Sequence, residues 1–149
     1  MIRYTDVLPI EVADELLELS VPLMTSLVVA GFPSPADDYL DEPIDLNKLV
    51  FARPSSTFLV RVAGDSMIEA GIRPGDLLVV DRAEQPSLGR IVIAVVNGDC
   101  TVKRLGRLPD GAMALLPENP KYQPVRLGPG VSIEMWGVVT YVLHDARKG

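Results

Sequence analysis

The stretch that decides the fold is residues 91–105, which read Ile-Val-Ile-Ala-Val-Val-Asn-Gly-Asp-Cys-Thr-Val-Lys-Arg-Leu. It begins with six apolar residues, a run typical of a buried strand. Asn97-Gly98 follows, and this dipeptide is the strongest short-range signal for a two-residue hairpin turn because both turn positions need a positive φ. The sequence therefore predicts that residues 99–105 return antiparallel to residues 91–96.

Further strands are expected on both sides of this hairpin. Residues 57–63 alternate at period two, which places Phe58, Val60 and Val62 on one side of a half-buried strand. Thirteen prolines and twelve glycines spread through the chain argue against long helices, and a 48% hydrophobic content argues against disorder. The sequence therefore predicts a mainly β fold, with more strands over residues 77–80, 112–116 and 132–143, the last bending at Gly137.

The N-terminal part of the chain has a different composition. Apolar residues at helical spacing within residues 10–19 indicate one short amphipathic helix at best. Residues 1–30 carry one basic and five acidic side chains, a net charge of −4, and are too few to hold a core of their own. The prolines in residues 33–35 then favour extended backbone. We expect an N-terminal arm over residues 1–40 and a β-rich body over residues 41–149.

Composition excludes several classes of function. A net charge of −6 argues against a nonspecific nucleic-acid or membrane-surface binder, because such proteins present clustered Lys and Arg. One His and one Cys are too few for a His/Cys metal cluster, so neither metal nor cofactor is expected. The apolar runs fall short of the ~20 residues of a membrane helix, and the first residues lack the pattern of a signal peptide. We therefore expect a cytoplasmic protein without a membrane segment.

The first candidate site is Gly64-Asp65-Ser66-Met67, directly after the strand predicted over residues 57–63. Taken alone, such a sequence is most often a turn whose Asp and Ser side chains bond the local backbone. In the functional interpretation Ser66 is a nucleophile presented at a tight turn. The backbone N–H groups of Asp65 or Ser66 would then face a developing oxyanion, and a base from elsewhere is required.

Lys103 is the candidate base, on the return strand of the hairpin. With regular alternation, Thr101, Lys103 and Leu105 share one face of that strand. Such a lysine usually extends its amine to water. The alternative is a neutral lysine in an apolar site, since lowering its pKa from ~10.4 to near 7 corresponds to about 4–5 kcal/mol, within the reach of burial. His144 is better explained as a solvated tail residue, and Cys100 as buried filler.

Five stretches together resemble a known family: Gly31-Phe32-Pro33-Ser34-Pro35, Gly64-Asp65-Ser66-Met67-Ile68, residues 75–81, Thr101-Val102-Lys103 and Gly137-Val138-Val139. They are similar to the LexA/UmuD family of self-cleaving Ser-Lys peptidases, whose Ser and Lys are separated much like Ser66 and Lys103, 37 positions apart. The resemblance implies a LexA/UmuD C-terminal-domain-like β-rich fold with an extended N-terminal arm. It also implies that Ser66 is the nucleophile, that Lys103 is its neutral general base, and that the chain cuts itself between Ala30 and Gly31.

The length of the arm favours the UmuD branch, because LexA-like repressors carry a helix-turn-helix domain that 30 residues with a net charge of −4 cannot supply. This resemblance implies a homodimer without a nucleic-acid-binding domain, whose cleavage is stimulated by a RecA-single-stranded-DNA filament. The product, residues 31–149, would join a UmuC-like Y-family polymerase in error-prone translesion synthesis during the SOS response to DNA damage.

Other interpretations stay open on the sequence. The chain could be a noncatalytic β-rich protein-interaction module, in which Ser66 and Lys103 are turn and surface residues. It could also be a regulatory fragment related to LexA-type repressors. A signal-peptidase-like enzyme acting on other proteins would need a membrane anchor, which the hydropathy does not provide.

Overall fold

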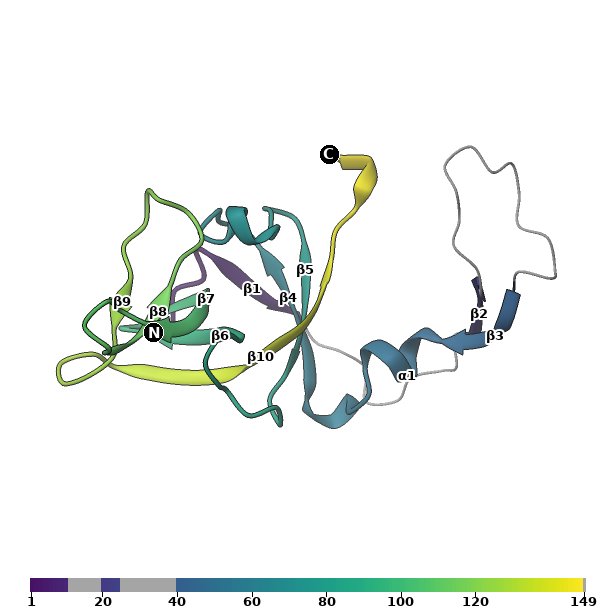
Figure 1. The fold of residues 1–149 in the computed structure, drawn as a ribbon, viewed down its shortest axis with the longest axis horizontal. Helices are drawn as coiled ribbons and strands as arrows, with labels where there is room; N and C mark the ends of the chain where they lie inside the picture. Colours follow the sequence, from purple (N-terminus) through teal and green to yellow (C-terminus); the bar gives the residue numbers. More distant parts are fainter. Residues whose placement is uncertain (11–19, 25–39, 149) are drawn as a thin grey trace.

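The computed structural model describes residues 1–10, 20–24 and 40–148, which form two antiparallel sheets (Figure 1). The large sheet has eight strands in the order β1-β4-β5-β10-β6-β7-β8-β9. Its strands are β1 (Val7–Ile10), β4 (Thr57–Val62), β5 (Leu77–Asp81), β6 (Ile91–Val96), β7 (Asp99–Arg107), β8 (Met113–Leu116), β9 (Val125–Arg126) and β10 (Ile133–Leu143). The predicted mainly β class is confirmed.

The second sheet pairs β2 (Ser20–Met24) with β3 (Leu40–Asp45) and stands apart from the large sheet in Figure 1. The only α-helix of the described residues, α1 (Leu46–Val50), follows β3 directly. Asp45 caps it, since its carboxylate accepts a hydrogen bond of 3.0 Å from the Asn47 amide. Residues 40–148 also contain three short 3-10 helices: η2 (Pro54–Ser56), η3 (Ile68–Ala70) and η4 (Ala146–Lys148). No helix among the described residues is long and apolar enough to cross a membrane.

The predicted hairpin is present. β6 and β7 pair antiparallel from Ile91 opposite Arg104 to Val96 opposite Asp99. Both turn residues have positive φ, 47° at Asn97 and 86° at Gly98, as a type I′ turn requires. β7 extends to Arg107, two residues beyond the predicted end, because its outer part pairs with β8.

β10 is the longest strand, and it joins the two halves of the large sheet. It pairs with β6 along one part and with β5 along the other, and its register shifts between Met135 and Gly137. A Cβ on Gly137 would lie 2.8 Å from Cγ1 of Val80 and 2.9 Å from the carbonyl oxygen of Asp81. The bend predicted at Gly137 therefore coincides with a β-bulge where only glycine fits.

The core has two parts, on opposite faces of β6. Ile93 and Val95 point into a cluster with residues of β4 and β5, whereas Val92 and Ala94 point into a cluster with residues of β7 and β8. Alternate residues of one strand are thus buried on both sides, as expected where a sheet curls around its own core. The first cluster contains Val7, Val60, Val62, Met67, Ile72, Leu78, Val80, Ile93, Val95, Cys100 and Val102.

β1 was not predicted from the sequence. It pairs antiparallel with β4 at the edge of the large sheet, from Val7 opposite Val62 to Ile10 opposite Leu59, and Val7 is fully buried. Pro9 is compatible with this place because an edge strand need not donate from every amide. The division into an arm over residues 1–40 and a body stays a prediction. The helix expected within residues 10–19 falls almost entirely outside the described residues.

Candidate active site

The turn that carries Ser66 follows β4 and is held by a segment far along the chain. The Glu118 amide donates to the Ser66 carbonyl at 2.8 Å, and Asn119 Nδ2 donates to the Asp65 carbonyl at 2.9 Å. These two bonds fix the peptide groups of the turn, because each holds one of its carbonyls on the segment at residues 118–119. Ser66 is itself only 2% exposed.

The Asp65 carboxylate is bound by the same segment. It accepts a hydrogen bond from the Tyr122 hydroxyl and forms an ion pair of 2.9 Å with Lys121 Nζ. The hydrogen bond from Tyr122, followed by that from Lys121, lowers the pKa of Asp65. The side chain of Asp65 thus anchors the turn. Its backbone amide, and not its carboxylate, is the predicted donor to an oxyanion.

Sequence reasoning did not find this support. Residues 117–122 read Pro-Glu-Asn-Pro-Lys-Tyr, a polar loop without periodicity. Nothing in a single sequence ties such a loop to a turn more than fifty residues earlier. The signal available was weak: one tyrosine in a loop, in a chain with few aromatic residues.

The structure brings Ser66 and Lys103 together. Lys103 Nζ lies 3.0 Å from Ser66 Oγ, and Lys103 is only 8% exposed on β7. The amine also donates to the Thr101 hydroxyl and, at 3.1 Å, to the Val102 carbonyl. Lys103 therefore does not extend its amine to water, and that interpretation of its role is wrong.

Burial has the largest effect on the pKa of Lys103. Removal from water penalises the ammonium form and lowers the pKa of Lys103, although the Asp6 carboxylate acts in the opposite direction. A lowered pKa increases the fraction of free amine near neutral pH, which is the form that can accept a proton from a serine hydroxyl.

Asp6 is a member of this site that the sequence did not reveal. Its Oδ2 atom lies within hydrogen-bonding distance of three groups on β7 and one in the Ser66 turn. The donors are Thr101 Oγ1 at 2.6 Å, the Val102 amide at 3.1 Å, Ser66 Oγ at 3.2 Å and Lys103 Nζ at 3.4 Å. In the sequence Asp6 counted only as one acid of an acidic arm.

A cavity of about 310 Å³ is lined by Thr5, Asp6, Gly64, Ser66, Asp99, Cys100, Thr101, Lys103 and Tyr122. Gly64 lets the N-terminal segment approach closely, since a Cβ at this position would lie 2.3 Å from Oδ1 of Asp6. Burial, with a smaller effect of Asp6, raises the pKa of the Cys100 thiol to about 11. Cys100 therefore stays a protonated, buried side chain at neutral pH, in agreement with its predicted role as filler.

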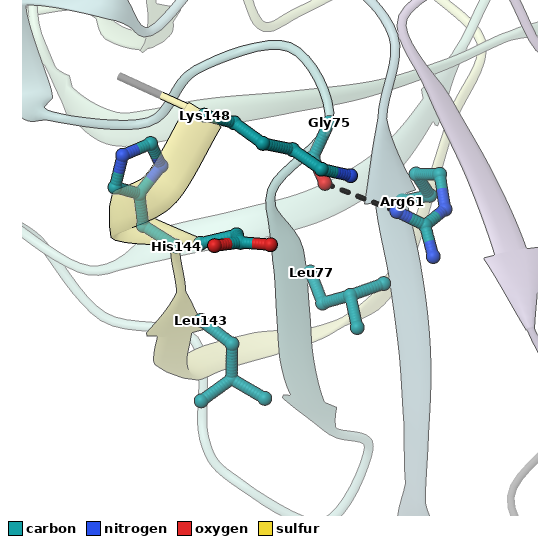
Figure 2. Close-up of a pocket in the computed structure, with 7 residues that line it drawn as sticks. Arg61, Gly75, Leu77, Leu143, His144 and Lys148 are labelled. Carbon is teal, nitrogen blue, oxygen red and sulfur yellow. Dashed lines mark hydrogen bonds between the residues drawn. The ribbon is translucent and has the colours of Figure 1, made fainter.

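His144 is exposed, as expected for a solvated residue, but it also binds the body. Its Nδ1 is 2.6 Å from Oδ1 of Asp76, which is only 2% exposed. It lines a pocket of about 350 Å³ in which Arg61 donates to the Gly75 carbonyl at 3.1 Å (Figure 2). This pocket shares no residue with the Ser66 cavity and contains no serine, threonine or cysteine.

The two expected residues of the cleavage site, Ala30 and Gly31, lie outside the described residues. Within the described ranges, no three His, Cys, Asp or Glu side chains gather in a way that would hold a metal ion. The described site therefore consists of a buried serine, a buried lysine and the carboxylate that binds both.

Comparison with known proteins identifies relatives over most of the chain. The family model described as Peptidase S24-like matches residues 22–140. Protein SamA of Salmonella typhimurium is 47% identical over 134 residues, which cover 90% of this chain and 92% of SamA. Protein ImpA of Escherichia coli is 46% identical over 127 residues, 85% of this chain and 86% of ImpA. The LexA repressor of an Acidovorax species is 37% identical over 130 residues, 87% of this chain but 57% of the repressor.

Proposed function

The chain belongs to the peptidase S24-like family, as a UmuD-type member of the LexA/UmuD group, and from this premise we propose that it is a serine peptidase that cuts its own chain between Ala30 and Gly31. Membership of the family supports serine peptidase chemistry in general. The observation that carries the specific proposal is the 3.0 Å separation of Lys103 Nζ and Ser66 Oγ, both buried. A Ser-Lys pair is an accepted alternative to a triad with histidine.

In the proposed mechanism, the free amine of Lys103 removes the proton from Ser66 Oγ as the oxygen attacks the Ala30 carbonyl carbon. The backbone N–H groups of Asp65 and Ser66 stabilise the oxyanion of the tetrahedral intermediate. Lys103, now an ammonium, gives its proton to the leaving nitrogen of Gly31 as the peptide bond breaks. Water then hydrolyses the ester between Ser66 and Ala30, which releases the new carboxyl end and restores the hydroxyl.

The sequence around the proposed cleavage site suits this reaction. Residues 27–29 are Leu-Val-Val, and extended apolar chain of this kind binds beside strands while its side chains fill pockets. Ala30 and Gly31 are small, so the carbonyl carbon can come close to Ser66 without a clash.

We assign the cleaved form to SOS mutagenesis, as its similarity to SamA and ImpA over almost their whole lengths supports. In this role a homodimer in the cytoplasm is processed on contact with a RecA-single-stranded-DNA filament. Residues 31–149 then act as a subunit of a Y-family translesion polymerase. The filament need supply no catalytic group, since it can accelerate the reaction by selecting the conformation in which the arm occupies the cleft.

Intact-mass analysis of the purified chain after incubation between pH 7 and 10 tests the proposal. We expect fragments 1–30 and 31–149, formed faster at alkaline pH where more of Lys103 is free amine. Ser66→Ala and Lys103→Ala should abolish both fragments. The matched variants Ser55→Ala and Lys48→Ala change exposed residues and should cleave like the parent chain.

The noncatalytic alternative predicts the opposite result. If no fragments form with alkali or with RecA filaments, or if they form equally in Ser66→Ala, the proposed peptidase mechanism is wrong. A cut at another bond would retain the Ser-Lys mechanism but reject Ala30-Gly31 as its site.

A further inference from the structure

The beginning of the chain lies across the peptidase site. The Asp6 carbonyl accepts hydrogen bonds from the amides of Ala63 and Gly64, at 2.7 and 3.0 Å, immediately before the Ser66 turn. β1 then continues along the edge of β4, where Val7 is fully buried in the core. Residues 6–10 are therefore bound as an added strand, the way that extended peptides bind to an exposed sheet edge.

The segment before Asp6 is held at the other side of the cavity. The Arg3 amide donates to the Gly98 carbonyl at 2.7 Å, and the Cys100 amide donates to the Arg3 carbonyl at 2.9 Å. The Arg3 guanidinium forms an ion pair of 2.6 Å with Asp99 and donates to the Asn97 carbonyl at 2.8 Å. The chain is thus fixed at both sides of the cavity, with Thr5 and Asp6 between the two attachments.

Asp6 directs its carboxylate at both members of the Ser-Lys pair, 3.2 Å from Ser66 Oγ and 3.4 Å from Lys103 Nζ. A negative charge so close to the amine favours the ammonium form, which cannot act as a base. The same carboxylate occupies space beside Ser66 Oγ that an incoming peptide carbonyl needs.

We propose that residues 3–10 are a built-in inhibitor of the peptidase site, with Asp6 as the residue that keeps Ser66 and Lys103 in an inactive, ion-paired arrangement. This inference rests on the proposed function of the pair. The arm around Ala30 reaches Ser66 only after Asp6 has left the cavity. Cleavage between residues 30 and 31 then leaves residues 3–10 attached to the body by noncovalent contacts alone.

The surroundings of Lys103 make a pH profile informative. The titratable groups that line its cavity are Asp6 before β1, Asp99 and Cys100 on β7, and Tyr122 on the opposite loop. Of these four, Asp6 is the one in hydrogen-bonding distance of Nζ, and it raises the pKa of Lys103 against the effect of burial. A carboxylate this close typically shifts an amine by about 1–3 pKa units.

The test is the self-cleavage rate of the full-length chain between pH 6 and 10, measured by intact mass. Asp6→Asn keeps the shape of the side chain and removes its charge. We expect the midpoint of the rate profile to fall by about one pH unit and cleavage at pH 7 to be about tenfold faster, since one pKa unit is a tenfold change in free amine. Asp110→Asn, which removes an exposed carboxylate paired with Arg126, is the matched control and should not move the profile.

A second full-length variant separates the effect of the N-terminal segment occupying the cavity from the effect of the Asp6 charge. Arg3→Ala removes the attachment to Asp99 without touching the Ser-Lys pair, so cleavage should accelerate severalfold with little change in the midpoint. Hydrogen exchange in a Ser66→Ala background should show faster exchange at the amides of Ala63 and Gly64 in both variants.

The outcomes distinguish this inference from the proposed function. If the parent chain cleaves in a Ser66-dependent way but Asp6→Asn cleaves at the parent rate or more slowly, with an unmoved midpoint, residues 3–10 do not inhibit the site. If neither the parent chain nor any variant cleaves, even at pH 10 or with RecA filaments, the proposed peptidase function itself is rejected.

Discussion

Val7→Ala tests whether the N-terminal segment is part of the folded body. Val7 is fully buried on β1, in the same apolar cluster as Val60 and Val62 of the neighbouring strand β4. The substitution removes the equivalent of two buried methylene groups, about 1.6 kcal/mol at ~0.8 kcal/mol each. The cavity left behind adds to this loss because an edge strand relaxes only partly. We expect the free energy of unfolding to fall by about 2–3 kcal/mol.

Leu8→Ala is the matched control, since Leu8 is the next residue of β1 and is 44% exposed. Its effect should stay within about 0.5 kcal/mol. Both variants are compared in a full-length Ser66→Ala background, so that cleavage cannot change the chain during the measurement.

Urea unfolding followed by fluorescence gives the free energies. Trp136 is the single tryptophan, and its ring centroid lies 6.3 Å from that of Tyr4 and 6.2 Å from that of Phe58. Its emission therefore reports on both the N-terminal segment and the body. If Val7→Ala changes the free energy of unfolding no more than Leu8→Ala does, β1 is not docked in solution and the reasoning about the cavity fails with it.

Three further predictions concern other parts of the molecule. Gly137→Ala should destabilise the fold by about 1–3 kcal/mol in urea unfolding, because the new methyl group meets Val80 and the backbone at the β10 bulge; an unchanged midpoint would contradict the packing described. Tyr122→Phe removes a hydrogen bond to Asp65 worth about 0.5–1.5 kcal/mol, so self-cleavage should slow by roughly twofold to tenfold in the intact-mass assay, and a parent-like rate would show that the Ser66 turn needs no such support. Burial raises the pKa of Asp81, but hydrogen bonds and an ion pair to its neighbours outweigh burial, so the pKa in the folded state is lowered. The stabilising contribution of Asp81 is therefore complete above the unfolded pKa of ~3.9 and is lost as pH falls through the folded pKa. Asp81→Asn should flatten this part of an acid-unfolding curve, and a curve identical to that of the parent chain would refute the assignment.

The parts of the fold that were predictable are those set by neighbouring residues. Asn97-Gly98 strongly favours a type I′ turn, and the apolar run before it is typical of a buried strand, so the hairpin was predictable from fifteen residues. Gly137 interrupts a long apolar strand, and the structure has its bulge there. Lys103 was a candidate because its strand alternates and because the family resemblance paired it with Ser66.

The parts that were not predictable depend on contacts distant in sequence. β1 has four residues, one of them proline, and becomes a strand only because β4 offers it an edge and a pocket for Val7. Asp6 belongs to the site only because β1 docks in this way. The loop at residues 117–122 likewise has no regular pattern. It supports the Ser66 turn through hydrogen bonds that span more than fifty residues of sequence.

The place of β1 has a consequence for the sheet itself. Within the full chain β4 is an inner strand, paired with β1 on one side and β5 on the other. Once residues 1–10 leave, β4 becomes the outermost strand and presents a row of unpaired backbone N–H and C=O groups beside the hollow that Val7 filled. Natural proteins seldom leave such a row open, because it readily pairs with another chain. Departure of the N-terminal segment would thus expose a sheet edge that can pair with a strand of another chain.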